Sequence, residues 1–339
     1  MSKRTTIKDI AADCGVSLST VSLVLNNSKR ISEKTRARVL ESVQRHNYQP
    51  NAQARALVSQ SSRVISVTVP ALEHVFADIY FGEIVSGIYD EASANGYKLL
   101  LDIARERFIE SKEYLNLFQN RHADGMLFVG ASTEDTYLID FEKEEYPFML
   151  VNHFFPGKSL DFYAVDYADC ARLAAEHFLK LGHRSIGLII GDNTHTGITF
   201  RDTFFQQLAE AGIPEADRPW VRGKWDEQSG YVGAEKLLEK NPGLTAIMGG
   251  NDRMAIGAMR HLNLLNKRIP EEVSVLGMDD IPASKYVTPG LSSISVDLYR
   301  IGLNSCNHIL RMIRGEERTC REFVQGNLVE RESTGPAPV

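Results

Sequence analysis

From Arg63 onward, short apolar runs alternate with amphipathic stretches, and this alternation limits the possible folds more than any other feature of the chain. Strands that alternate with helices form βαβ units in a parallel sheet. The runs are almost continuously apolar, which is typical of strands that helices cover on both faces. The apolar runs lie at 64–69, 97–102, 125–129, 148–152, 185–190, 245–250 and 273–278. The amphipathic stretches lie at 80–95, 111–121, 167–181, 199–211, 229–240 and 252–265. So many units predict two doubly wound lobes rather than a single sheet.

The beginning of the chain follows a different pattern, that of two short helices joined at a glycine. Residues 6–26 read TIKDIAADCGVSLSTVSLVLN. Thr6 can cap the first helix, with Asp9 at capping-box spacing. Ser17 can cap the second helix after a turn at Gly15. The first helix has an apolar stripe at helical spacing that comprises Ile7, Ile10, Ala11 and Cys14.

The second helix leaves one of its faces free. At about 100° per residue, Val21, Val24 and Leu25 share one side and should pack inward. The opposite side carries Leu18, Ser19, Ser22 and Leu23. Two short helices around a glycine turn, the second with a free face, form a helix-turn-helix that places one helix in a DNA groove.

A third helix should place Val39, Leu40 and Val43 inward and end before Pro50, which prevents a longer helix. The segment 51–62 that follows begins with a helical pattern, but it is too short to be a stable helix alone. That property makes it a candidate switch.

Charge is distributed unevenly along the chain. Residues 1–60 contain ten Lys or Arg and four Asp or Glu, a net charge of +6, whereas the whole chain carries −6. The positive field that attracts phosphate groups is therefore confined to the first sixty residues.

Length and composition exclude several classes of protein. The 339 residues exceed one ordinary core and predict two or three domains. The N-terminus has no apolar signal region, and no run approaches about 18 apolar residues, so we expect a cytoplasmic protein without a membrane span.

The four cysteines are scattered without metal-ligand spacing. P-loop, dinucleotide-binding and nucleophile-elbow motifs are absent from the sequence. We therefore predict no enzyme, no catalytic residue, no cofactor and no metal.

With these motifs, the chain resembles the lactose/galactose repressor (LacI/GalR) family of bacterial transcription regulators over essentially all of its length. The head motif T-I-x-D-I-A-x-x-x-G-V-S-x-x-T-V-S-x-x-L-N is matched throughout 6–26. The linker phrase NYQPNAQARAL follows at 47–57. Later phrases are ADG (123–125), LGHRSIGLI (181–189), TGxxxR (196–201), ND (251–252), MAIGA (254–258) and VSVLGMDD (273–280).

The resemblance implies an N-terminal all-α helix-turn-helix domain and a hinge helix, followed by a periplasmic-binding-protein-like α/β core of two doubly wound parallel-sheet lobes. We expect the head at 1–49 and the hinge helix with its linker at 50–62. The N-terminal lobe should comprise 63–164 and 294–324, and the C-terminal lobe 165–293 and 325–339.

In the family, the free face of the second helix reads the major groove, and the hinge helix enters the minor groove. Expected major-groove residues are Leu18, Ser19, Ser22 and Leu23. Expected phosphate contacts are Thr6, Ser17, Thr20, Tyr48, Lys29 and Arg30, which position the head without reading sequence. In the hinge, Ala54, Arg55 and Leu57 should lie in the minor groove, where Leu57 would act as an apolar wedge that kinks the duplex.

The family also binds a small effector between its lobes, where loops at the carboxyl ends of strands converge. Matched positions predict an effector site of Phe81, Asn152, His195, Thr196, Arg201, Trp225, Asn251, Asp252 and Asp279. Carboxylates accept from hydroxyl groups, arginine donates a rigid fork, and aromatic rings offer flat apolar faces. This chemistry favours a sugar or sugar derivative, with a nucleobase or another small metabolite as the alternative.

These features predict a homodimeric, ligand-responsive regulator of transcription, most simply a repressor of sugar or carbon metabolism genes. It would bind a palindromic operator in double-stranded DNA, and the effector would alter hinge-helix order and so the affinity for DNA. A sugar-binding protein with no role at DNA shares the lobes but does not explain the basic head.

Overall fold

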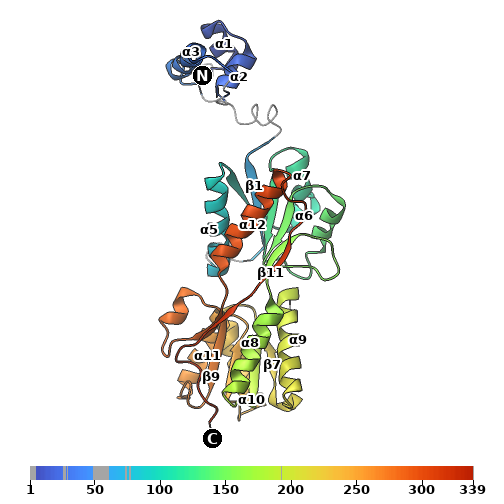
Figure 1. The fold of residues 1–339 in the computed structure, drawn as a ribbon. Coiled ribbons are helices and arrows are strands. Elements are labelled where there is room, and N and C mark those ends of the chain that lie inside the picture. Colours follow the sequence, from blue (N-terminus) through green and yellow to red (C-terminus); the bar gives the residue numbers. More distant parts are fainter. Residues whose placement is uncertain are drawn as a thin grey trace. The chain divides into compact units, whose positions relative to one another are not determined.

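The computed structural model describes residues 5–25, 28, 30–48, 61–72, 75, 78–191 and 193–338. Its internal contacts divide the chain into two units, Met1–Ser62 and Arg63–Val339 (Figure 1). Each unit has a core of its own and is described separately.

In its described residues, the first unit contains three helices, α1 (Ile7–Cys14), α2 (Leu18–Leu25) and α3 (Glu33–Arg45). The Asp9 carboxylate accepts hydrogen bonds from the backbone N–H and the hydroxyl of Thr6, at 2.8 and 2.7 Å. Gly15 ends α1 with φ of 59°, a left-handed conformation that glycine adopts without steric cost. The Ser17 hydroxyl accepts from the Thr20 backbone N–H at 3.1 Å and so caps α2. The core of this unit consists of Ile10, Ala11, Cys14, Val21, Val24 and Val39.

One expectation for the third helix is wrong, because Leu40 does not point inward. Its side chain is 43% exposed, whereas Val39 is fully buried and Val43 is partly buried. The buried position is instead that of Ser42, whose hydroxyl donates to the Asp13 carboxylate at 2.6 Å. A polar pair between α1 and α3 thus replaces the apolar contact that the sequence pattern predicts.

The second unit contains two six-stranded sheets, one in each lobe. The first has the strand order β11-β5-β4-β3-β1-β2 and the second β12-β10-β9-β8-β6-β7. The first sheet comprises β1 (Val64–Pro70), β2 (Lys98–Ala104), β3 (Gly125–Val129), β4 (Phe148–Val151), β5 (Phe162–Val165) and β11 (Arg321–Val324). The second comprises β6 (Ile186–Ile190), β7 (Trp220–Arg222), β8 (Ala246–Gly249), β9 (Ser274–Asp279), β10 (Ser292–Ser295) and β12 (Asn327–Val329). Neighbouring strands pair in parallel, as β1 and β2 do with Val64 opposite Lys98, whereas β12 is antiparallel to β10.

Helices cover both faces of each sheet, as near-continuous apolar strands require. The first sheet is covered by α5 (Ile79–Ala94) and α12 (Leu298–Ile313) on one face, and by α6 (Glu106–Glu110), α7 (Glu113–Gln119) and the 3₁₀ segment η2 (Thr136–Lys143) on the other (Figure 1). The second sheet lies between α8 (Tyr167–Lys180) with α9 (His195–Glu210) and α10 (Glu227–Lys240) with α11 (Asp252–Leu264). Short 3₁₀ segments are η3 (Glu215–Asp217) and η4 (Pro282–Lys285). The fold is the predicted one of two doubly wound lobes.

Helices α5 and α12 approach each other closely at two glycines. A Cβ atom on Gly87 would lie 2.0 Å from the carbonyl oxygen of Tyr299, and one on Gly302 would lie 1.9 Å from that of Ile84. No real Cβ atom tolerates such distances, so the packing of the first lobe depends on these two glycines.

The chain passes between the two sheets at three places. It leaves β5 for α8 at Asp166, leaves β10 for α12 at 296–297, and leaves β11 for β12 at 325–326. The Asp166 N–H donates to the Val324 carbonyl at 2.8 Å, so the first and third passages are bonded to each other. β10 extends the second sheet to Ser295. Among the helices in the described parts of the chain, none has both the length and the apolar character needed to cross a membrane.

Candidate DNA-binding surface and effector site

The surface of α2 has the composition that the helical pattern predicts. Val21 and Val24 are buried, whereas Leu18 and Leu23 are 44% and 38% exposed. Ser19 is also exposed, and Ser22 is partly buried. The exposure of two leucine side chains on one short helix is unfavourable, because it leaves apolar surface in contact with water. An apolar contact with a DNA base, such as a thymine methyl group, would remove that surface from water.

The expected phosphate contacts differ in their exposure. Thr6, Ser17 and Arg30 are exposed, whereas Thr20 and Tyr48 are partly buried. Tyr48 packs against the core of the first unit. Four other residues expected to contact DNA, Lys29, Ala54, Arg55 and Leu57, lie outside the described residues.

Charge in the first unit is partly neutralised where α1 meets α3. Asp13 lies 3.5 Å from the Arg45 guanidinium and 3.3 Å from the His46 imidazole. The hydrogen bond from Ser42 lowers the pKa of Asp13, and Arg45 and His46 lower it further. Asp13 is therefore a structural acid, and it stabilises the contact between the two helices.

In the second unit, four of the expected effector residues lie at or just after the carboxyl ends of parallel strands. Asn152 follows β4, Trp225 follows β7, Asn251 follows β8, and Asp279 ends β9. Three of them have left-handed backbone conformations, with φ of 52° at Asn152, 65° at Trp225 and 104° at Asp279. Such strain in non-glycine residues is concentrated at functional sites, where it fixes the direction of a side chain.

Asn152 joins two tyrosines from different helices. Its side-chain amide donates to the hydroxyls of Tyr80 on α5 and Tyr167 on α8, at 3.1 and 2.9 Å. Its amide oxygen accepts from the Val165 N–H at 3.0 Å. Since both hydroxyls accept a hydrogen bond from Asn152, each can still donate its own O–H to a ligand.

The Asp279 carboxyl group interacts electrostatically with Tyr80 and Tyr167 and with two further acids. Burial raises the pKa of Asp279 well above its usual value, and the carboxylates of Asp252 and Asp78 raise it further. Among the described residues, no hydrogen bond to its carboxyl group contributes to this shift. A partly exposed acid of this kind can bind the hydroxyl or N–H group of a ligand.

Trp225 is fixed against the loop between β6 and α9. Its indole N–H donates to the Asn193 side chain at 3.0 Å, and its carbonyl accepts from the Asn251 side chain at 3.1 Å. The ring lies so close to Gly191 that a Cβ atom there would be 2.3 Å from it. The first lobe reaches the same loop, because the Thr133 N–H donates to the Asn193 carbonyl at 2.9 Å.

Two histidines and a phenylalanine form an aromatic cluster between the lobes. The His195 ring, at the start of α9, lies 5.8 Å from that of His153 and 5.5 Å from that of Phe155. Burial lowers the pKa of His153 to about 3, with a smaller effect from His195, and burial also lowers the pKa of His195. Both rings are therefore neutral at pH 7. His153 is 1% exposed, and its Nε2 has no hydrogen-bond partner in the described structure.

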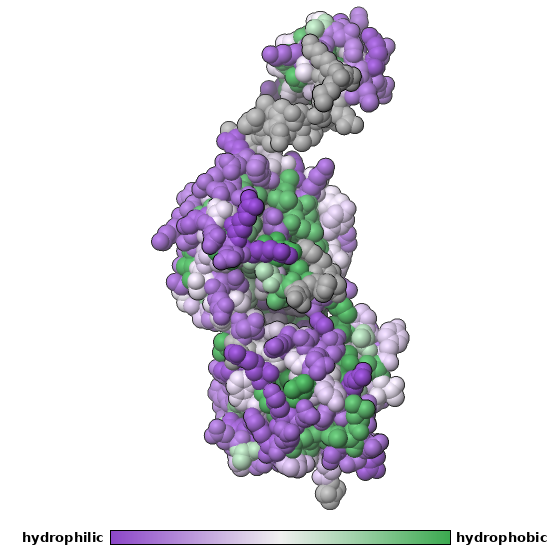
Figure 2. All heavy atoms as spheres, turned by 180° about the vertical axis from the view of Figure 1, so that it is seen from behind, coloured by the Kyte–Doolittle hydropathy of each residue, from purple (hydrophilic) through white to green (hydrophobic). Residues whose placement is uncertain are grey.

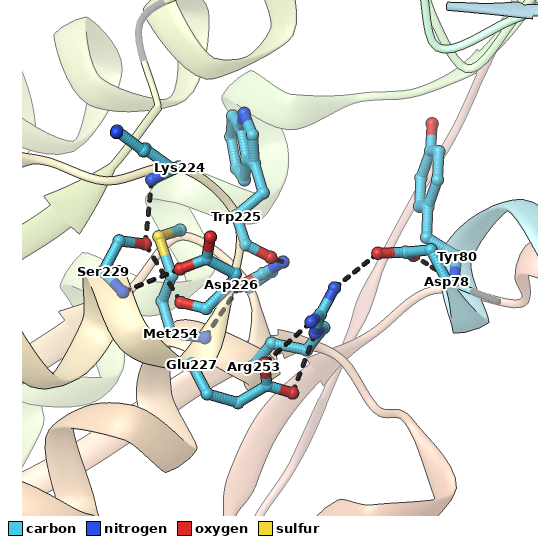
Figure 3. A network of polar contacts seen from close by, with 10 residues as sticks. Asp78, Tyr80, Lys224, Trp225, Asp226, Glu227, Ser229, Arg253 and Met254 are labelled. Carbon is cyan, nitrogen blue, oxygen red and sulfur yellow. Dashed lines mark hydrogen bonds and ion pairs between the residues drawn. The ribbon is translucent and has the colours of Figure 1, made fainter. Parts of the chain in front are cut away.

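An ion-pair network connects the two lobes beside this group (Figure 3). Arg253 on α11 donates to the Asp78 carboxylate, which also caps α5 by accepting from the Tyr80 N–H at 2.9 Å. The same guanidinium binds both oxygens of Glu227, at 2.8 and 2.7 Å. Figure 3 shows the rings of Trp225 and Tyr80 pointing to the same side of this network, one from each lobe.

Three residues expected at the effector site have other contacts in this structure. The Phe81 ring is 7% exposed and packs edge-on against Tyr80 in the core of the first lobe. Arg201 lies about 9 Å further along α9 than His195, since an α-helix rises about 1.5 Å per residue. Its guanidinium lies 4.9 Å from the centre of the Trp220 ring and pairs with Asp202 at 2.8 Å.

The third, Asp252, is fully buried, and both oxygens of its carboxylate accept hydrogen bonds. One accepts from the Ile281 N–H at 2.8 Å and the Ser284 hydroxyl at 2.6 Å, and the other from the Ser293 hydroxyl at 2.6 Å. Burial raises the pKa of Asp252 to about 7, although all three donors lower it. These contacts hold the loop after β9 in place, which gives Asp252 a structural role.

Thr196, also expected at this site, is buried and its hydroxyl donates to that of Thr194, the cap of α9, at 3.1 Å. The structure adds residues that the sequence analysis missed, namely Asp78, Tyr80, Phe155, Tyr167, Asn193 and Arg253. A signal for two of them existed in the sequence, since Tyr80 precedes an expected site residue and Arg253 follows another. The others are brought to the site only by the fold.

Comparisons with known proteins agree with this division of the chain. Residues 6–51 match the model of bacterial regulatory proteins of the lacI family, and residues 175–334 match that of the periplasmic binding protein-like domain. The HTH-type transcriptional regulator DegA of Bacillus subtilis is 30% identical over 98% of this chain and 99% of its own length. The HTH-type transcriptional repressor PurR of Erwinia tasmaniensis is 30% identical over 98% of both chains.

A solved structure of the lac repressor dimer, bound to operator and the anti-inducer ONPF, aligns with a TM-score of 0.87. It is 26% identical and covers 98% of this chain and 100% of its own. The match with DegA spans both units of this chain. The chain therefore belongs to the lacI family of bacterial regulatory proteins.

Proposed function

We propose that this ligand-responsive, DNA-binding transcription regulator is a repressor that binds a palindromic operator as a homodimer. The observation that carries the proposal is the exposed apolar face of α2 in a basic head, where Leu18 and Leu23 have no protein core to join. As a regulator and not an enzyme, it acts where the DNA is, in the cytoplasm. Ser19 and Ser22 would supply polar contacts to base edges, and Leu18 and Leu23 apolar ones.

A dimer is supported by apolar side chains that remain exposed on the second unit. The face shown in Figure 2 is mostly hydrophilic over the head, while hydrophobic areas interrupt both lobes. Exposed apolar residues of the lobes include Ile79 and Tyr89 on α5, Leu264 and Leu265 at the end of α11, and Tyr286. Apolar patches on a protein surface are typical of protein interfaces. A second copy would place a second head at the matching half-site of a palindrome.

The effector that the second unit fits best is an uncharged, polyhydroxylated molecule, a sugar or sugar derivative. The Tyr80 and Tyr167 hydroxyls and the Asp279 carboxyl offer hydrogen bonds to hydroxyl groups, and Trp225 offers a flat apolar face. His153 and His195 are neutral, and Arg253 already binds two carboxylates, so this group of residues supplies no free positive charge for a phosphate.

A nucleobase is the second candidate, and the aromatic cluster of His153, Phe155 and His195 favours it. Planar rings stack on aromatic side chains, and the unpaired Nε2 of His153 could bind a polar ring atom. Binding of unphosphorylated sugars, sugar phosphates and free nucleobases to the full chain, measured by calorimetry, distinguishes the two candidates. Tight binding of phosphorylated sugars alone would contradict both.

The DNA-binding proposal is tested by selection from a random duplex library with the full chain. Enriched sequences should contain an inverted repeat. The Leu23→Ala variant should then bind the selected duplex about tenfold more weakly, because the apolar groups removed no longer become buried against DNA, at about 0.8 kcal/mol per buried CH₂. Leu40→Ala is the matched control, since Leu40 is equally exposed on α3 but outside α2. Equal affinity of both variants would overturn the assignment of α2.

A further inference from the structure

Three residues with metal-binding side chains lie together in the first lobe, and none of them belongs to the two candidate sites. They are His308 on α12, Cys320 just before β11 and Glu322 on β11. Their ligand atoms all lie within 4.8 Å of one another. Figure 1 shows α12 and β11, both at the red end of the colour bar, in the same lobe.

The position of each ligand is fixed by its surroundings. The His308 ring lies 5.4 Å from that of Tyr163, and its Nδ1 lies 2.9 Å from the Glu317 carboxylate. If Nδ1 carries the proton and donates it to Glu317, the lone pair of Nε2 is free, and Nε2 lies 3.9 Å from the Glu322 carboxylate. An imidazole that donates one N–H to a carboxylate while the other nitrogen binds a metal is a recurring arrangement in metal sites.

Cys320 is 2% exposed and is held on both sides of its backbone. Its N–H donates to the Asp161 carboxylate at 3.0 Å, and its carbonyl accepts from the Phe162 N–H at 2.8 Å. The sulfur lies 3.6 Å from the Phe162 carbonyl, a weak contact that a metal can replace. The third ligand, Glu322, has a side chain that is 55% exposed, so it can close on an ion without displacing packed atoms.

The donor set indicates which ion fits. A thiolate, an imidazole and a carboxylate are together typical of zinc, which binds four ligands in a tetrahedron at about 2.0–2.3 Å. Ligand atoms on such a tetrahedron are about 3.3–3.8 Å apart, so only a small movement of Glu322 is needed. We propose that His308, Cys320 and Glu322 bind a zinc ion, with Glu317 orienting the imidazole and water as the fourth ligand.

Binding must release a proton from the thiol. Burial raises the pKa of Cys320 to about 12, and the acids Glu322, Glu317 and Asp161 raise it while Arg311 lowers it. The free protein therefore holds the neutral thiol at pH 7. As zinc binds, the S–H bond breaks, a Zn–S bond forms, and the proton passes to the buffer. Zinc affinity should consequently rise with pH over the range in which the protein stays folded.

The test uses the full metal-free chain and zinc sulfate, with no DNA or effector. Calorimetric titration in two buffers of different ionisation enthalpy should give one zinc per chain and release of about one proton at pH 7. Cobalt, which binds similar sites, should produce a thiolate-to-metal charge-transfer absorption band. Cys320→Ser should abolish this band, and Glu317→Gln should weaken zinc binding about 10–100-fold through the lost orientation of His308.

Two further variants keep the proposal falsifiable if Cys320→Ser fails to fold. Glu322→Gln changes an exposed side chain and should weaken zinc binding at least tenfold. Glu316→Gln, an exposed neighbour outside the cluster, should bind zinc like the unchanged protein. Absence of stoichiometric binding, or equal zinc affinity of the Glu322→Gln and Glu316→Gln variants, would overturn the proposal.

Discussion

Arg253 of α11 and Asp78 of α5 form an ion pair that joins the second lobe to the first. Asp78 also caps α5, so the bond from Arg253 reaches the beginning of the helix that carries Tyr80. Any movement that separates the lobes at this place must break the pair. Because Glu227 lies in the same lobe as Arg253, it retains the guanidinium when Asp78 moves away.

Replacing Arg253 should therefore loosen the contact between the lobes. We expect Arg253→Gln to lower the free energy of unfolding by about 1 kcal/mol or less, since the pair is partly exposed and surface ion pairs contribute little. Its larger effect should be a changed affinity for whichever effector binds, because the equilibrium between lobe arrangements shifts. Urea denaturation and ligand titration measure the two effects.

Arg260→Gln removes a positive charge from the same helix outside the ion pair, and so controls for the loss of charge. Asp78→Asn breaks the ion pair but keeps the cap of α5, because asparagine can still accept from the Tyr80 N–H. If Arg253→Gln and Asp78→Asn both leave effector affinity at the value of Arg260→Gln, the ion pair has no part in the response.

Ionisation of the Asp279 carboxyl group should make the stability of the folded protein depend on pH. Its pKa is raised in the folded protein by burial and by the carboxylates of Asp252 and Asp78. Between the pKa of the unfolded chain, about 4, and the raised folded pKa, the folded state binds more protons than the unfolded state. Stability therefore falls as pH rises through that range.

Asp279→Asn removes the cost of ionising this carboxyl group. The variant should be more stable than the unchanged protein at pH 8, show a weaker decrease in melting temperature between pH 5 and pH 8, and lose effector binding. Burial also raises the pKa of Asp252, so its ionisation likewise lowers stability as pH rises. Part of the decrease in melting temperature should therefore remain in Asp279→Asn. Glu239→Gln, an exposed charge removal on α10, should retain the original slope. Identical slopes in the two variants would contradict this account of Asp279.

DNA binding should depend steeply on salt, because the basic charge is confined to the head. If a dimer neutralises about 6–10 phosphates, the logarithm of affinity should fall by about 0.9 per phosphate for each unit in log salt concentration. Fluorescence anisotropy at several potassium chloride concentrations measures the slope. Leu23→Ala should lower affinity without changing that slope, since it removes no charge, and a shallow slope in the unchanged protein would be inconsistent with a phosphate-binding head.

Two glycines of α5 provide a matched pair for testing the first lobe. Gly87→Ala should destabilise it by about 3 kcal/mol, because the new Cβ would overlap the Tyr299 carbonyl of α12. Gly82→Ala should instead be neutral or stabilise by up to about 1 kcal/mol, because no atom lies within 4 Å of the new Cβ and alanine favours the helix. Thermal unfolding of both variants measures the difference, and equal effects would show that the contact between α5 and α12 can adjust.

The apolar runs predicted β1, β2, β3, β4, β6, β8 and β9, but several short strands were missed, including β5, which reads FYAV and is wholly apolar. β10 reads SSIS, yet Ser292 and Ser293 are fully buried. Their hydroxyls are satisfied by Thr334 and Asp252, partners that are distant in sequence. Because this strand was missed, the alternation of strand and helix was lost there, and α12 was missed with it.

For the effector site, the sequence indicated which residues lie at strand ends, but not which groups their side chains contact. Asn152, Trp225 and Asp279 lie at strand ends as expected, since the ends of apolar runs are visible in the sequence. The direction of a side chain depends on local backbone and neighbours, which a linear pattern does not contain. Arg201 thus lies over Trp220, and Tyr80 rather than Phe81 binds Asn152.

The three passages between the sheets have a mechanical consequence. The bond between Asp166 and Val324 links two of them. Gly326 in the third passage packs against the elements next to the other two, since a Cβ atom there would be 2.7 Å from the sulfur of Cys170 on α8 and 3.0 Å from Ile294 on β10. We expect three adjoining connecting segments to resist twisting and sliding of the lobes more than bending about the line that runs through them. The lobes should then move mainly as a hinge, and displacements at Asp78 and Arg253 should correspond to a change in one angle.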